Sequence, residues 1–149
     1  MSALLFDSNV WLALTFKHHP FHETARASFR ECAPKSPAAF CRSTEQSYLR
    51  LASTPALLAH YRCTGLNNRD VVGFLNDFHQ LPQVAFIAEP PSTRDLWLKL
   101  SDSSFASPKV WMDAYLAALA ISANLRLVTF DKDFLQFQPL GLNLHLLTA

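Results

Sequence analysis

The chain has 149 residues, of which 50% are hydrophobic, and its formal net charge is +1. This length and composition are typical of a single folded domain, here residues 1–149, and they exclude an intrinsically disordered chain. No uninterrupted apolar run has the length of a bilayer span, and the N-terminus lacks the features of a signal peptide. We therefore expect a soluble cytoplasmic protein with no membrane partner.

Positive charge is concentrated in one part of the chain. Residues 17–69 carry eight Lys and Arg against three Glu, whereas the remainder carries five Lys and Arg against nine Asp and Glu. An ordinary solvated surface and a wall that faces phosphate groups both fit this distribution. The three cysteines form no CxxC pair, which predicts buried free thiols rather than disulfides or a zinc site.

The predicted elements alternate between strand and helix along the chain. Short apolar runs predict strands at 3–6, 38–41, 84–88, 125–130 and 142–147. Helices are predicted at 10–16, 20–32, 43–51, 55–80 with a break around 65–68, 92–100 and 110–123. The expected helix starts are a Ser8/Asn9 cap, Pro20, a capping box of Ser43 and Gln46, and Ser92.

This alternation predicts an α/β fold with a parallel sheet of about five strands, covered by helices on both faces. Only three glycines are present, so neither a P-loop nor a GxGxxG motif is possible. A phospho-acceptor domain of the response-regulator kind would need an Asp after the third strand, where this chain has "AFIAEPP". Both nucleotide binding and phospho-acceptance are therefore disfavoured.

Several carboxylates fall at one predicted edge of the sheet. Asp7 and Asp131 end the first and fourth strands, and Glu45 lies in the first turn after the second strand. Asp113 joins them if its helix, 110–123, begins on the same side. Each acid on its own also fits a helix cap or a turn. Ligands in open α/β sheets bind at the carboxyl ends of the strands, so the shared position favours a site.

Clustered carboxylates repel one another, by about 4 kcal/mol for two unit charges 4 Å apart at an effective dielectric constant of 20. A divalent cation relieves this repulsion, and ligands that are all oxygen suit Mg²⁺ or Mn²⁺ better than zinc. The sequence therefore predicts a carboxylate site for Mg²⁺ or Mn²⁺, which would activate a water and stabilise charge on a phosphate.

Three segments in this order, "LLFDSNVWLAL", "WMDAYLAALA" and "LRLVTFDKDF", resemble the best-marked segments of PIN-domain ribonucleases. They are most similar to the VapC toxins of bacterial toxin–antitoxin pairs, and "HPFHETARASF" resembles the second helix of one VapC branch. The resemblance spans the chain. It implies a PIN fold and endonucleolytic RNA cleavage that depends on Mg²⁺ or Mn²⁺ and leaves a 5′-phosphate and a 3′-hydroxyl.

The resemblance also assigns residues to roles. Asp7, Asp113 and Asp131 match the metal-binding family acids, and Asn9 matches the asparagine that supports the site by hydrogen bonding. Glu45 matches the second acid and is assigned to catalysis, although the Leu-x-x-Gly pattern that follows it in many relatives is absent here. Asp133 is either an accessory ligand or a surface acid. Arg42 and Arg50 are candidate contacts for the RNA backbone.

Partners follow from the same resemblance. It implies a homodimer, a VapB-like antitoxin whose tail crosses the active site, and a structured RNA substrate, either tRNA or rRNA. Four aromatic residues near the first helices, Trp11, Phe16, Phe21 and Phe29, either line a groove for the antitoxin or fill the core. A catalytically inactive PIN fold that binds RNA or protein is the alternative function.

Overall fold

Five parallel strands form one sheet in the computed structural model, which describes residues 3–148. The strands are β1 (Leu4–Phe6), β2 (Ala38–Phe40), β3 (Val84–Phe86), β4 (Arg126–Thr129) and β5 (Asn143–Leu146). Their order in the sheet is β3-β2-β1-β4-β5, and all four neighbouring pairs are parallel. Chain order reverses at β1, which lies in the centre of the sheet. The predicted parallel sheet is confirmed.

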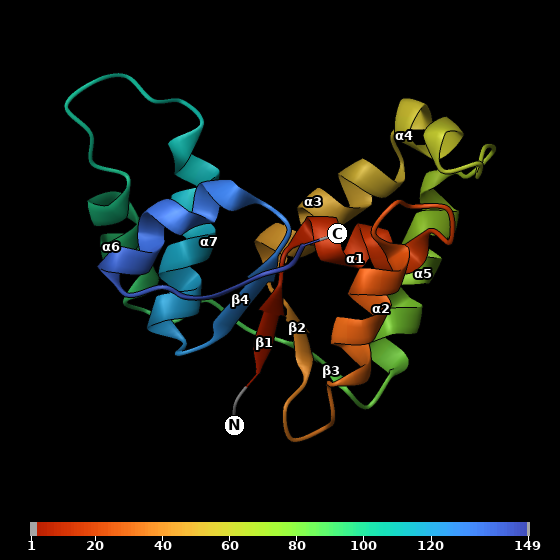
Figure 1. Ribbon diagram of the computed structural model, residues 1–149, viewed down its shortest axis with the longest axis horizontal. Coiled ribbons are helices and arrows are strands. Elements are labelled where there is room, and N and C mark those ends of the chain that lie inside the picture. Colours follow the sequence, from red (N-terminus) through yellow and green to blue (C-terminus); the bar gives the residue numbers. More distant parts are fainter. Residues whose placement is uncertain (1–2, 149) are drawn as a thin grey trace.

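Helices cover both faces of this sheet, as the sequence predicted (Figure 1). One face packs against α1 (Ser8–Thr15), α2 (His22–Arg30), α3 (Arg42–Ala52) and α5 (Asn68–Gln80), with α4 (Pro55–His60) beside them. The other face packs against α7 (Val110–Ser122) and η1 (Lys132–Leu140), with α6 (Thr93–Leu100) packed on α7.

Alternate residues of each strand point to opposite faces, so the sheet separates two apolar cores. Phe6, Phe40 and Val128 belong to the core beneath α1 and α3, whereas Leu5 and Leu127 belong to the core beneath α7. Each of these side chains is fully buried. Because both faces of the sheet are covered, each strand is apolar on both sides. This is why the strands occur in the sequence as continuous apolar runs.

Two of the four aromatic residues near the first helices, Trp11 and Phe16, fill the core rather than line a partner groove. Trp11 is fully buried, stacks on the Phe40 ring at 3.9 Å, and donates its indole N–H to the Phe6 carbonyl. Phe16 is buried as well, while Phe21 and Phe29 pack against the same core. These rings cover one sheet face, and the half-buried Phe21 and Phe29 keep part of their surface exposed, so a role of these two in partner binding stays a prediction.

Element boundaries differ from the prediction where side chains compete to cap a helix. Asp7, not Ser8 or Asn9, is the N-cap of α1. The Thr44 hydroxyl accepts from the Cys41 backbone N–H at 2.9 Å, so α3 begins at Arg42 and the capping box expected from Ser43 and Gln46 does not form. Further differences include a later start of α2, at His22, an earlier break in the predicted helix 55–80, after His60, an earlier end of β3, at Phe86, and the unpredicted 3-10 helix η1.

The cysteines are free thiols, as the sequence predicted. Cys41 is buried, whereas Cys32 and Cys63 are half-buried. Burial raises the pKa of the Cys32 thiol to about 11, which makes it a poor nucleophile at neutral pH. Within residues 3–148, the helices are too short or too polar for any of them to cross a membrane.

Candidate active site

The pairing of β1 with β4 brings two of the predicted acids to one edge of the sheet. Phe6 pairs with Val128, and the Asp7 N–H donates to the Val128 carbonyl at 2.9 Å. Asp7 leaves β1 at its carboxyl end, and Asp131 lies just beyond the carboxyl end of β4. The two carboxylates therefore share one edge because neighbouring parallel strands end together.

The first turn of α7 adds a third acid, Asp113. Asp7, Asp113 and Asp131 line one cavity of about 250 Å³, which we call the acidic cavity, and its wall includes Asn9 and Arg50. Carboxylate oxygens of Asp113, Asp131 and Asp133 lie within 4.8 Å of one another. The structure thus brings together acids that the sequence placed on three separate segments, with Asp133 at the exposed side.

Thr129, which sequence reasoning missed, connects these segments. Its fully buried hydroxyl donates to Asp7 Oδ2 at 2.7 Å and accepts from the Asn9 amide at 3.2 Å and from the Asp131 N–H at 3.0 Å. Asn9 Oδ1 also accepts from the Phe130 N–H. The signal for Thr129 in the sequence is a small hydroxyl residue that closes an otherwise apolar strand, two positions before a predicted ligand.

Burial and mutual repulsion disfavour the charged forms of these acids. Burial, followed by the charges of Asp131, Asp7 and Asp133, raises the pKa of Asp113 from 3.8 to about 6. Burial also raises the pKa of Asp7, and the Asp131 charge adds to this, against the hydrogen bonds from Thr129 and Ser8. No Lys, Arg or His within residues 3–148 forms an ion pair with any acid of the cluster.

This arrangement fits a divalent metal ion. Buried carboxylates without a cationic partner are costly unless they protonate or bind a cation. The cluster offers oxygen ligands alone, which suits Mg²⁺ or Mn²⁺. Asp7, Asp113 and Asp131 are the residues that would hold such an ion.

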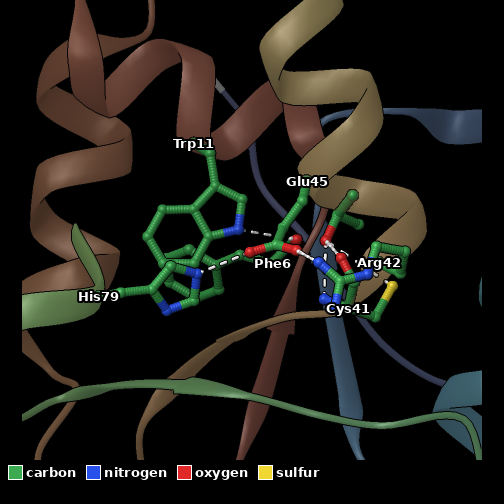
Figure 2. Close-up of polar contacts among 7 residues, drawn as sticks. Phe6, Trp11, Cys41, Arg42, Glu45 and His79 are labelled. Atoms are coloured by element: carbon green, nitrogen blue, oxygen red, sulfur yellow. Dashed lines mark hydrogen bonds and ion pairs between the residues drawn. The ribbon is translucent and has the colours of Figure 1, made fainter. Parts of the chain in front are cut away.

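The structure does not bring Glu45 into the acidic cavity. Its carboxylate accepts from Arg42 Nη1 at 2.6 Å and lies 2.8 Å from His79 Nε2, so it sits between these two side chains (Figure 2). Ser43, Thr44 and Ser47 on α3 face the cavity, whereas the adjacent position 45 points toward α5. This placement gives no support to the catalytic role predicted for Glu45.

The two predicted RNA contacts occupy different positions. Arg50, six residues beyond Thr44 on α3, lines the acidic cavity and forms no ion pair with the described residues. Arg42 is held by Glu45 and lies over the Phe86 ring, 4.8 Å from its centroid. Of the two, Arg50 borders the acidic cavity, and neither forms an ion pair with the acids of the cluster among the described residues.

Known proteins share this fold and this order of segments. The PIN domain model matches residues 4–138. Ribonuclease VapC41 of Mycobacterium tuberculosis is 37% identical over 142 residues, which cover 95% of this chain and 97% of the relative. The chain therefore belongs to the PIN domain family and, within it, to the VapC ribonucleases.

Solved toxin–antitoxin structures have the same fold. VapBC2 of Rickettsia felis, bound to a DNA fragment from its promoter, superposes with a TM-score of 0.66 at 13% identity, covering 98% of this chain and 99% of that one. VapBC-1 of nontypeable Haemophilus influenzae gives a TM-score of 0.64 at 13% identity, covering 97% of each chain. At these identities the likeness is one of fold.

Proposed function

We propose that this VapC ribonuclease is an endoribonuclease toxin that depends on Mg²⁺ or Mn²⁺. The observation that carries the proposal is the acidic cavity: three half-buried carboxylates from β1, α7 and the end of β4, with no cation of residues 3–148 paired to them. A cavity whose only role was to bind RNA would repel the phosphate backbone, because its three carboxylates outnumber Arg50, the basic side chain in its wall.

Asp7, Asp113 and Asp131 hold the metal, and Asp133 is an accessory ligand at the exposed side of the cluster. When bound, the ion lowers the pKa of a water and stabilises negative charge on the phosphate. Hydrolysis forms a bond between the water oxygen and phosphorus and breaks the P–O3′ bond, which leaves a 5′-phosphate and a 3′-hydroxyl. Asn9 and Thr129 orient Asp7 and the 129–131 turn.

Arg50 is the residue best placed to hold the RNA backbone. It lines the acidic cavity, carries no ion pair, and projects from the same helix as Ser43 and Ser47. A guanidinium group can contact two phosphate oxygens at once, which positions a strand without reading its sequence. Substrate RNA is therefore held by Arg50 beside the carboxylates that bind the metal.

The relatives support a partner as well. The solved VapBC structures contain toxin and antitoxin together, so a VapB-like antitoxin is the expected inhibitor of this chain. An antitoxin side chain of positive charge would neutralise the acidic cavity in place of the metal. We propose that the chain is a homodimer that binds such an antitoxin. Light scattering, and co-purification with the product of the neighbouring small reading frame, test both statements.

The deciding experiment is cleavage of cellular RNA by the purified chain with Mn²⁺ and with EDTA. We expect cleavage with Mn²⁺ alone, and none by Asp113→Asn under either condition. Sequencing the new 5′ ends identifies the substrate as tRNA or rRNA. Binding of RNA by a folded protein without cleavage in any divalent metal would favour the inactive binding module instead.

A further inference from the structure

A second cavity opens beside the acidic cavity, between α3 and the α6–α7 pair. It measures about 290 Å³, and we call it the aromatic groove. Three aromatic side chains, Trp97, Trp111 and Tyr115, form one wall, and Arg42, Ser43 and Gln46 of α3 form the other. The combination of aromatic rings with a guanidinium and an amide is unlike the apolar cores on either side of the sheet.

The aromatic wall is rigid at its base and open at its rim. Trp97 donates its indole N–H to the Trp111 carbonyl at 2.8 Å, and its ring meets Tyr115 edge to face. The Tyr115 hydroxyl donates to Glu89. Trp111 is 47% exposed, and its one ring contact among the described residues is with Trp97, at an interplanar angle of 75°. No ring is stacked parallel on Trp111, which leaves its π face for a planar ligand.

The opposite wall carries polar groups without partners. Neither the Ser43 hydroxyl nor the Gln46 amide forms a hydrogen bond with the residues that the structure describes. Arg42 is held in place by Glu45 and Phe86, and its side chain remains 72% exposed. Glu45 is therefore a positioning residue for Arg42 at the edge of the aromatic groove.

The aromatic groove is continuous with the acidic cavity. Ser43 and Met112 line both, and Met112 lies between Trp111 and Asp113 in the first turn of α7. Trp111 of the aromatic groove and Asp113 of the acidic cavity therefore lie two residues apart in the first turn of one helix. Single-stranded nucleic acids bind by this combination, in which bases stack on aromatic rings beside a basic group.

We propose that the aromatic groove binds an unpaired nucleobase of the RNA, adjacent to the nucleotide that is cleaved. The base stacks on Trp111, Arg42 contacts the neighbouring phosphate, and Ser43 and Gln46 hydrogen-bond the edge of the base. This inference rests on the proposed ribonuclease function. It adds which surface of the chain receives the base next to the cleaved bond.

The test measures the binding of a short oligo(A) RNA in EDTA. Binding is monitored through the quenching of tryptophan fluorescence. Trp11 is fully buried under Phe40, so quenching by RNA reports on Trp97 and Trp111. Loss of base stacking weakens binding by roughly 5- to 150-fold, and we expect Trp111→Leu to show a loss in that range. Trp111→Phe, which keeps an aromatic face, should recover part of the affinity.

The control is Phe105→Leu, a change of the same kind at an aromatic residue that is 73% exposed and lines neither cavity. Its affinity for oligo(A) should equal that of wild type. Circular dichroism establishes that each variant is folded. In the cleavage assay with Mn²⁺, Trp111→Leu should raise the KM for RNA far more than it lowers kcat.

Three outcomes separate this proposal from its alternatives. Wild type that cleaves RNA, with unchanged affinity and KM in Trp111→Leu, overturns the subsite and leaves the ribonuclease function standing. Wild type that binds oligo(A) through Trp111 but cleaves nothing supports the subsite and overturns the ribonuclease function. Dissociation of a dimer by Trp111→Leu, with unchanged RNA affinity, would assign the surface to self-association and overturn the proposal.

Discussion

Thr129 and Asp7 are joined by a 2.7 Å hydrogen bond across the β1–β4 pair, from the Thr129 hydroxyl to Asp7 Oδ2. The same hydroxyl accepts from Asn9 and from the Asp131 backbone. One buried oxygen thus fixes an acid on β1 relative to an acid beyond β4. The relative placement of these two acids depends on this residue, although it carries no charge.

Thr129→Val tests that dependence. The substitution keeps the shape of the side chain and leaves Asp7, Asn9 and the Asp131 N–H without their shared partner. Loss of a buried hydrogen-bond partner costs about 1–3 kcal/mol, which urea denaturation should detect. Cleavage with Mn²⁺ should fall along with stability. Thr129→Ser retains the hydroxyl and should restore cleavage, and a fully active Thr129→Val would show that Asp7 needs no such support.

Asp113→Asn should abolish cleavage in a protein that remains folded, and Asp7→Asn should do the same. An amide is of similar size but cannot balance the charge of a divalent cation. The measurement is RNA cleavage with Mn²⁺ alongside circular dichroism. Asp95→Asn, at a carboxylate that is 94% exposed on α6, is the matched control and should cleave as wild type does. Normal turnover by folded Asp113→Asn would remove Asp113 from the site.

The stability of the metal-free protein should depend on Asp113. Its pKa is raised from 3.8 to about 6 in the folded state, so the folded protein binds this proton more tightly than the unfolded chain does. The resulting stabilisation is fully present below pH 3.8 and is lost as the pH rises through about 6. Asp113→Asn cannot ionise. In EDTA it should therefore withstand more urea than wild type at pH 7, and the difference should shrink toward pH 4.

Asp95→Asn provides the comparison for this experiment too, because its carboxylate is solvated. Its urea midpoint should follow that of wild type at each pH. A difference between Asp113→Asn and wild type that is the same at pH 4 and pH 7 would mean that packing, rather than charge, controls the effect.

Mn²⁺ or Mg²⁺ should raise the melting temperature of wild type. A ligand bound by the folded state alone adds RT ln(1 + [L]/Kd) to the free energy of unfolding, about 2.7 kcal/mol at one hundred times Kd. Differential scanning fluorimetry at low salt measures the shift, and EDTA should reverse it. The shift should vanish in Asp7→Asn. Equal melting temperatures with and without millimolar Mn²⁺ would argue against a preformed site.

Much of the fold follows from patterns that are local in the sequence. The strands are short apolar runs, and helices with apolar faces separate them, so the parallel sheet and the positions of Asp7 and Asp131 at its edge were predictable. Asp113 was predictable as an isolated acid in an apolar helix. These features depend on one segment at a time, together with the rule that parallel strands end on the same edge.

Contacts between distant segments were not predictable in this way. Thr129 acts through a hydrogen bond to a residue 122 positions away. The direction in which the Glu45 side chain points depends on which face of α3 packs against α5. The start of α3 depends on the hydrogen bond of Thr44, rather than Ser43, with the Cys41 backbone. Trp97 and Trp111 belong to different helices, so their shared groove exists only after α6 packs on α7.

The Glu45→Gln variant distinguishes a structural role of Glu45 from a catalytic one. Its side chain is 9% exposed and its partners are Arg42 and His79, so Glu45→Gln weakens both contacts without touching the acidic cavity. We expect a loss of about 1–3 kcal/mol in the free energy of unfolding, measured by urea denaturation. The melting-temperature shift produced by Mn²⁺ should keep its wild-type size, and any loss of cleavage should be recovered at higher RNA concentration, because Arg42 is displaced while the metal ligands are not. If Glu45→Gln instead abolishes both the Mn²⁺ shift and cleavage at saturating RNA, Glu45 belongs to the metal site, and its carboxylate must leave Arg42 and His79 when the ion binds.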